Sequence, residues 1–242
     1  MTSRTESSRG VQLPEQLVSL RLFGSFVRGD NDASSNLDVI AVLRPGSDLK
    51  TLPALNASIQ TMFDQRASVS FYSSKRVRQM HAAGHLFAWH LFLQSRPMGW
   101  LPEPDAIAQL GKPVDYARAR EDVESLTEIL TTIPASLDRC PSNTTYEAGV
   151  MFVCLRNIAL SASWYSKSGL DFTRYSPFNL EREVGLRFPI SREGFASLVE
   201  SRLSSQRGTA RTAVDLGNLL SMHTQALSWS DSVTEFIAGN QT

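Results

Sequence analysis

Hydrophobic and polar residues alternate in three short stretches of the first hundred positions. Residues 19–23, 37–43 and 67–72 each read as a strand. Apolar residues at helical spacing lie around these stretches and predict helices there. The predicted helices span residues 12–18, 52–63, 73–81 and 85–94, and a short edge strand is expected at 98–101. Strands that alternate with helices predict a mixed α/β core.

The pattern changes after a stretch rich in proline and glycine, which contains Pro102, Pro104, Gly111 and Pro113. Beyond it no strand pattern remains, and the second half predicts an all-helical bundle of four or five helices. The predicted helices span residues 116–137, 144–164, 177–183, 192–203 and 209–228, with a last segment to 237. Thr144 and Glu147 have the spacing of a capping box at the start of the second of these helices.

Composition narrows the class of protein without naming it. The chain has 242 residues, 42% hydrophobic and 20% charged, which is typical of an ordinary globular protein. Its formal net charge is zero, so no bulk attraction to nucleic acid or membrane is implied. No apolar run is long enough for a membrane span, and the polar N-terminus lacks the apolar centre of a secretory signal. Cys140 and Cys154 match no zinc or redox spacing, which favours reduced thiols in the cytoplasm.

Candidate chemistry lies around the second predicted strand. Gly24 and Ser25 follow the first strand, and ten residues later come Asn36, Leu37 and Asp38. Successive side chains of a strand point to opposite faces, so Asn36 and Asp38 should share one face while Leu37 turns to the other. Two oxygen-bearing side chains opposite a glycine turn are suited to a hard cation and a polyphosphate.

These residues resemble the signature of the DNA polymerase β-like nucleotidyltransferase superfamily. The resemblance is specific over residues 19–43, where Ser25, Arg28, Gly29, Ser35 and Asp38 match, loose to about residue 100 and absent beyond. Within the superfamily, the chain looks most like the small bacterial members of toxin–antitoxin, phage-defence and antibiotic-modifying types. The resemblance implies a nucleotidyltransferase core at 12–104, after a disordered tail at 1–11 and before the helical bundle at 114–242.

The resemblance also implies roles for particular residues. Gly24 and Ser25 would hold the phosphates of a nucleoside triphosphate, and Asp38 with Asn36 would bind Mg²⁺ or Mn²⁺. Arg28 would pair with phosphate, although a surface arginine packed on the sheet is an equal alternative. Lys75, in a basic cluster with Arg76 and Arg78, would contact the triphosphate or a nucleic-acid acceptor, unless the cluster is a solvated helix face.

Two departures from the family pattern bear on activity. Asn36 stands where the first carboxylate of an Asp-x-Asp pair is expected, and an amide oxygen brings no charge to a two-metal site. Either the natural protein has weakened or lost catalysis, or Asp has been changed deliberately to Asn. The strand at 67–72 contains no third acid, which leaves Ser70 as the expected occupant of the third catalytic position and Asp64 just before it. A serine hydroxyl is a poor general base near neutral pH.

Other reactive residues favour structural roles. His81 and His85 have helical spacing, but Gly84 lies between them and no further ligand is evident, so structural histidines are expected. In the helical half, Arg156 and Asn157 lie on an apolar helix without the following histidine of a HEPN-type ribonuclease. The bundle is therefore expected to bind an acceptor, a partner protein or a second copy of the chain.

The sequence leads to a main hypothesis with two alternatives. The main hypothesis is transfer of a nucleoside monophosphate from an NTP or dNTP to an acceptor hydroxyl with Mg²⁺, in phage defence or a toxin–antitoxin system. The first alternative is a non-catalytic protein that binds a nucleotide or a partner. The second is an antibiotic nucleotidyltransferase. The acceptor, the preferred base and the oligomeric state are left open.

Overall fold

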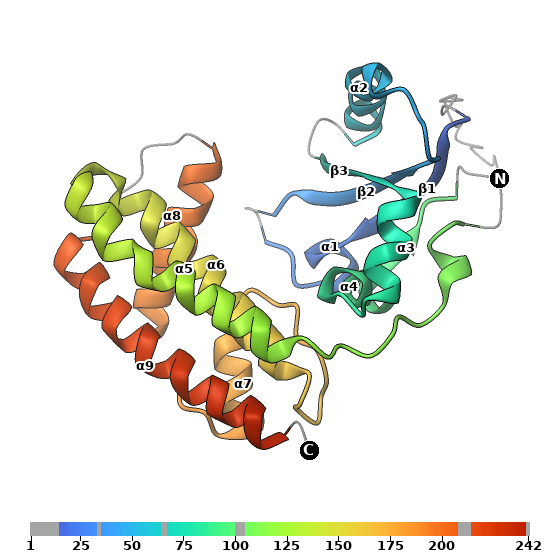
Figure 1. The fold of residues 1–242 in the computed structure, drawn as a ribbon. Helices are drawn as coiled ribbons and strands as arrows, with labels where there is room; N and C mark the ends of the chain where they lie inside the picture. The colour runs from blue at the N-terminus through green and yellow to red at the C-terminus, as the bar shows by residue number, and fades with distance from the viewer. Residues whose placement is uncertain (1–14, 33–34, 64–66, 100–104, 208–213, 241–242) are drawn as a thin grey trace, which may run out of the picture. The chain divides into compact units, whose positions relative to one another are not determined.

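The computed structural model describes residues 15–32, 35–63, 67–99, 105–207 and 214–240. The described residues form two compact units, one up to Tyr116 and the other from Ala117 onward. The first is a small mixed sheet with helices on both faces, and the second is helical (Figure 1). We propose that these units correspond to the two domains expected from the sequence.

Four strands form the sheet of the first unit in the order β3-β2-β1-β4. Strand β1 spans Leu17–Phe23 and pairs antiparallel with β2, Leu37–Leu43. Strand β3, Ala67–Ser73, runs parallel to β2, and the short β4, Ser95–Pro97, pairs antiparallel with β1. Strand β2 lies inside the sheet and its residues from Val39 to Leu43 are buried, which explains its nearly continuous apolar run.

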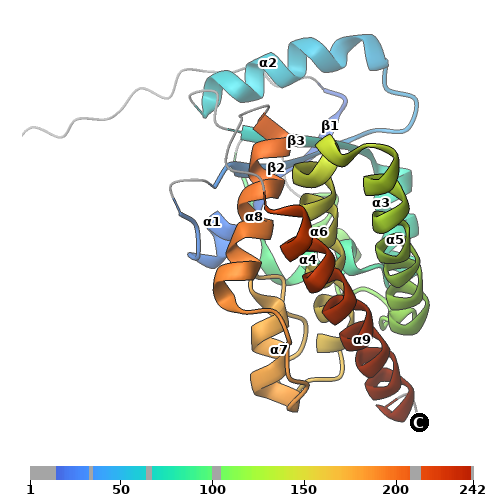
Figure 2. The same cartoon turned by 90° about the vertical axis from the view of Figure 1, so that its left-hand side faces the viewer.

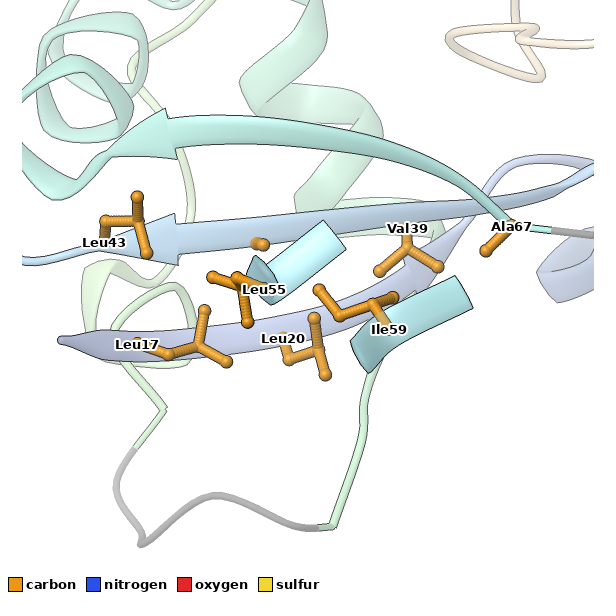
Figure 3. Packing of buried hydrophobic residues seen from close by; sticks show 8 residues of the cluster. Leu17, Leu20, Val39, Leu43, Leu55, Ile59 and Ala67 are labelled. Carbon is orange, nitrogen blue, oxygen red and sulfur yellow. The ribbon is translucent and has the colours of Figure 1, made fainter. Parts of the chain in front are cut away.

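One face of the sheet packs against α2, Leu52–Met62, which follows the short helix η1 at Leu49–Thr51. Figure 3 shows Leu55 and Ile59 of α2 packed with Leu20 and Val39 of the sheet. Leu17, Ala41, Leu43 and Ala67 complete this cluster. The odd-numbered residues of β2 therefore point to α2.

The opposite face packs against α3, Ser74–Ala82, and α4, Leu86–Gln94. Ile40 and Val42 of β2 meet Val77 and Met80 of α3 in this second cluster. After β4 the chain returns to the edge of β1, where the Ala106 amide donates to the Val18 carbonyl, and forms the short helix η2 at Ala108–Leu110. Asp38 belongs to the same face as Ile40, because both occupy even positions of β2.

The second unit is built around α6, Thr144–Ser163, most of whose residues are buried. Helix α6 packs against α5 (Ala119–Arg139), α7 (Ser176–Val184), α8 (Arg192–Arg207) and α9 (Leu216–Asn240), and η3 at Pro141–Asn143 joins α5 to α6 (Figure 2). An aromatic cluster around Phe195 fills the space beside α6. No helix among these described ranges is both long enough and apolar enough to cross a membrane.

Most predicted elements are present, and three predictions are wrong. The helix expected at 12–18 is a turn followed by β1 where it is described, while positions 12–14 lie outside the described residues. The edge strand expected at 98–101 is not formed by residues 98 and 99, and the described edge strand is Ser95–Pro97, although Met98 still donates its amide to the Leu20 carbonyl; positions 100 and 101 lie outside the described residues. The capping box is absent, since Glu147 accepts a hydrogen bond from Ser136 and Thr144 donates to the Pro141 carbonyl.

Candidate active site

The candidate site lies at one end of the β1–β2 pair, where β1 ends at Phe23 and β2 begins at Leu37. Phe23 is the register partner of Asp38, so the two residues are direct neighbours across the ladder. Gly24 follows with φ +77° and ψ −153° and begins the single-turn helix α1, Ser25–Arg28. This backbone conformation favours glycine, because a side chain at positive φ is strained.

Gly24 also lies directly against the carboxylate of Asp38. A Cβ atom placed on Gly24 would be less than 3.0 Å from Asp38 Oδ2 and 3.3 Å from its Cγ. No side chain fits between this backbone and the acid. The Gly-Ser turn and Asp38 are therefore adjacent in space, and the partly exposed carboxylate of Asp38 faces the turn.

Asn36 is exposed and lies directly before β2, two residues from Asp38. Ser35, which precedes it, donates its amide to the Asp32 carbonyl and its hydroxyl to Asp32 Oδ1. The loop that leads into β2 is thus held by its own polar contacts. Among the residues that the structure describes, no group of three or more His, Cys, Asp or Glu side chains could hold a metal.

The register of β3 brings Ser68, rather than the expected Ser70, beside Asp38. In the parallel β2–β3 pair, Asp38 has Ser68 as its register partner, whereas Ser70 lies beside the buried Ile40. Ala67 and Val69 pack toward α2, so Ser68 and Ser70 point to the same side of the sheet as Asp38. The hydroxyl nearest in register to Asp38 is that of Ser68. The same alternation that indicated Ser70 contains Ser68, but strand register is not visible in one sequence. Asp64 lies outside the described residues.

Arg28 is tied to neighbouring side chains. Its Nε donates to both carboxylate oxygens of Asp30 at 3.1 Å, its Nη2 lies 3.1 Å from Asp30 Oδ1, and its Nη1 donates to Gln94 at 3.2 Å. Only 15% of the Arg28 side chain is exposed. Any phosphate bound by Arg28 would have to compete with Asp30. The sequence analysis missed this acid, although it stands only two positions away.

Lys75 lies at the other end of the sheet. It follows β3, whose last residue, Ser73, is the register partner of Leu43 at the end of β2. Five residues of strand separate Leu43 from Asp38, which is about 17 Å at about 3.3 Å per residue. A triphosphate between Gly24 and Asp38 is out of reach of Lys75, so the predicted contact is wrong. Lys75, Arg76 and Arg78 are exposed on α3, as expected of a solvated helix face.

The histidines and Arg156 have structural partners. His85 begins α4 as its N-cap, and its Nδ1 accepts from the Phe87 amide at 3.0 Å. His81 Nε2 lies 3.2 Å from the Gly111 carbonyl oxygen. Arg156 donates to the carbonyls of Phe172 and Thr173, and so holds the loop between α6 and α7. These contacts support structural roles for all three residues.

Comparison with known proteins supports the fold. Neither a family model nor a curated protein matches the chain. Among solved structures, the spectinomycin adenyltransferase AAD(9) from Enterococcus faecialis, solved with ATP and spectinomycin, matches with a TM-score of 0.51. The match covers 93% of each chain at 8% sequence identity. The chain therefore has the fold of a nucleotidyltransferase, with a small mixed sheet followed by a helical region.

Proposed function

We propose that the protein is a nucleotidyltransferase, which transfers a nucleoside monophosphate from a nucleoside triphosphate to an acceptor hydroxyl and releases pyrophosphate. The observation that supports this most is the contact between the Gly24 turn and the Asp38 carboxylate in a nucleotidyltransferase fold. Gly24 and Ser25 would bind the β- and γ-phosphates, since the absence of a side chain at Gly24 permits close approach of a ligand to the backbone.

The residues around Asp38 fit one divalent cation better than two. Mg²⁺ is commonly held by one or two carboxylates together with substrate phosphates and waters, and Asp38 with the Asn36 amide oxygen meets that need. Two cations a few ångströms apart call for more negative charge than a single described carboxylate supplies. When bound, the cation would neutralise charge on the phosphates. Asp38 would orient the α-phosphate end of the nucleotide, and Ser68, its register partner, would donate a hydrogen bond beside it.

Asn36 favours a second candidate function, a protein that binds a nucleotide without transferring it. The site lacks the first carboxylate, and β3 supplies serines where a third acid is expected. Such a protein would serve as a nucleotide sensor or as an antitoxin-like partner. For either candidate function we propose a role in phage defence or in a toxin–antitoxin system, which is what the sequence resemblance implies.

The two candidates are separated by restoring the missing acid. The unchanged protein and the Asn36→Asp variant are each incubated with α-labelled ATP, GTP, CTP or UTP and with Mg²⁺ or Mn²⁺. Spectinomycin is the first acceptor to test, because the structural neighbour was solved with it. We expect Asn36→Asp to raise the rate of pyrophosphate release at least about tenfold, which corresponds to about 1.4 kcal/mol, because a carboxylate brings to the divalent cation a negative charge that the Asn36 amide lacks.

The matched control is the double variant that combines Asn36→Asp with Asp38→Asn. It keeps a single carboxylate at this end of β2 but moves it from position 38, within the strand, to position 36, before the strand. This variant should be inactive. If the unchanged protein and Asn36→Asp both bind nucleotide and neither releases pyrophosphate, the result would support the second candidate function, nucleotide binding without transfer. If neither form binds any nucleotide in the presence of divalent cations, both candidates are rejected.

A further inference from the structure

Arg28 and Asp30 belong to the same tight loop as the Gly24 turn. The Arg28 amide donates to the Gly24 carbonyl at 3.2 Å, and the Asp30 amide donates to the Ser25 carbonyl at 3.2 Å. Gly29 lies between them with φ +82°, a conformation that ends α1 and turns the chain back. The ion pair of Arg28 and Asp30 therefore starts from the backbone that forms the proposed phosphate site.

The guanidinium of Arg28 already has an acceptor at each of its three nitrogens. Asp30 accepts from Nε at 3.1 Å and lies 3.1 Å from Nη2, and Gln94 of α4 accepts from Nη1 at 3.2 Å. The edge formed by Nε and Nη2 is one that a phosphate can bind in the same two-point manner as a carboxylate. A phosphate at this edge must displace Asp30.

The two partners of the ion pair differ in how easily they can leave it. The Arg28 side chain is 15% exposed and is also held by Gln94, whereas the Asp30 side chain is 39% exposed. Asp30 continues into the exposed residues Asn31 and Asp32. The carboxylate can thus turn into water, where it is well solvated, while the guanidinium stays against α4.

The balance of charge favours this exchange. An ion pair between partly exposed side chains contributes little, because solvent screens it and both side chains lose freedom. The phosphates of a nucleoside triphosphate carry more negative charge than one carboxylate, and their contacts with an arginine are among the strong hydrogen bonds. A bound triphosphate therefore competes successfully, and the affinity that remains is reduced by the free energy of the broken ion pair.

We propose that Asp30 is an autoinhibitory counter-ion, which occupies Arg28 in the nucleotide-free protein and raises the nucleotide concentration needed to fill the site. When the β- and γ-phosphates bind at Gly24 and Ser25, Arg28 exchanges the carboxylate for a phosphate oxygen. The inference rests on the proposed function for the position of the phosphates. It does not depend on transfer, because both candidate functions include nucleotide binding.

The test is calorimetric titration of the full chain with ATP and Mg²⁺, for the unchanged protein and for Asp30→Asn. We expect Asp30→Asn to bind ATP about fivefold more tightly, which corresponds to about 1 kcal/mol, the upper end of what an exposed ion pair contributes. AMP lacks the β- and γ-phosphates, so its affinity should be the same for both proteins.

Two further variants separate the ion pair from a general effect of charge. Asp32→Asn removes the same charge from the same loop, where Asp32 accepts from the Ser35 hydroxyl, and should change the affinity for ATP by less than about twofold. In an Arg28→Met background, Asp30→Asn should no longer tighten binding, because the guanidinium that it releases is absent.

A second measurement follows the exchange in the unchanged protein and needs no folded variant of Asp30. The Nε–H resonance of Arg28, assigned by its absence in Arg28→Lys, is recorded in ¹⁵N-correlated NMR spectra. Saturation with ATP and Mg²⁺ should shift this resonance, and saturation with AMP should not. An unmoved resonance in the ATP-saturated protein would show that Arg28 keeps Asp30, and would reject the proposal.

The calorimetric results can overturn the proposal in three ways. Asp30→Asn binds ATP no more tightly than the unchanged protein, Asp32→Asn tightens binding as much as Asp30→Asn, or the gain persists without Arg28. Weaker binding by Asp30→Asn would instead make Asp30 a residue that holds the loop in its binding shape. If no form binds ATP, the proposed function fails together with the inference, a result distinct from ATP binding that is indifferent to Asp30.

Discussion

At the scale of single residues, Gly24 is the position where backbone conformation and site chemistry coincide. Its positive φ and its contact with Asp38 both exclude a side chain. We expect Gly24→Ala to destabilise the protein by about 1–3 kcal/mol and to displace the Asp38 carboxylate. Urea denaturation measures the first effect, and titration with a nucleotide and Mg²⁺ measures the second.

Gly29 provides the matched control for this substitution. It has φ +82°, yet nothing lies within 4 Å of where its Cβ would be. Gly29→Ala should therefore cost only the backbone strain, about 1 kcal/mol, and leave nucleotide binding unchanged. If the two variants lose the same stability and the same affinity for nucleotide, the contact between Gly24 and Asp38 does not contribute to nucleotide binding.

Cys154 is a second residue with a measurable consequence. Burial in α6 raises the pKa of its thiol from 9.0 to about 12, because the thiolate is disfavoured away from water. Folding thus favours the protonated form. Its contribution to stability is fully present below about pH 9 and is lost as the pH rises from there toward about 12.

We expect the free energy of unfolding to fall between about pH 9 and about pH 11 more steeply for the unchanged protein than for Cys154→Ala. Urea denaturation at each pH measures both slopes. Cys140, the other free cysteine, is less buried and should react first with an alkylating reagent in the native state. Parallel pH profiles for the two proteins would show that folding leaves the pKa of the thiol unchanged.

The sequence was sufficient to predict site residues that are recognised from a short segment of chain. Gly24 and Asp38 were predicted to be neighbours because a glycine turn and an acid at a strand start are local features. Ser68, Asp30 and the position of Lys75 depend on strand register and on which end of a strand faces the site. Those properties arise from pairing between distant segments, so one sequence did not reveal them.

At the scale of secondary structure, α5 contains a proline that another helix compensates. Pro134 has no N–H, so the Leu130 carbonyl four residues earlier lacks its usual partner within the helix. His223 of α9 lies with its Nε2 2.8 Å from that carbonyl oxygen and is itself buried. The histidine therefore donates the hydrogen bond that the proline cannot, and links α9 to α5.

This link predicts a coupling between two substitutions. His223→Leu should destabilise the protein by about 1–3 kcal/mol, because it leaves the Leu130 carbonyl buried without a donor. In Pro134→Ala the restored amide bonds to the same carbonyl, so His223→Leu should cost at least about 1 kcal/mol less there. The measurement is a double-mutant cycle by chemical denaturation. Equal costs in both backgrounds would mean that the carbonyl does not need the histidine.

Among the strands, prediction succeeded where hydrophobicity alone decides the structure. The apolar run of β2 was predicted with the observed ends because both of its faces are covered. Residues 17–18 were assigned to a helix because their short apolar spacing fits either structure. Pairing with β2 makes them part of β1, which is a tertiary effect on an ambiguous segment.

At the scale of the whole molecule, two compact units predict local rather than global effects of core substitutions. Ile158 of α6 and Ile40 of β2 are both fully buried, one in each unit. Replacement of either by alanine should cost about 2–5 kcal/mol within its own unit. Hydrogen exchange measured by mass spectrometry should then accelerate in α5–α9 for Ile158→Ala and in β1–β3 for Ile40→Ala. Equal acceleration in both units would indicate a single cooperative structure.

The division between an α/β unit and a helical unit follows from the sequence, since strand patterns end before the proline- and glycine-rich segment. The sequence did not indicate a cavity of about 210 Å³ that lies beside Arg21 in the first unit. Its wall comes from β1, α3, α4 and residues near 110, which are brought together only by the return of the chain along β1. Surfaces made by distant segments are the part of a fold that local patterns describe least.

The pairing of Phe23 with Asp38 has a consequence for the order in which the protein forms. These residues pair across an antiparallel ladder and stand fifteen positions apart in the sequence, so their contact closes with a smaller loss of chain entropy than contacts between more distant segments. Strand β3 needs the crossover through α2, and β4 returns to β1 from more than seventy positions away. The Gly24 turn and its acid can therefore meet early on the folding route, before most of the surrounding chain has reached its place.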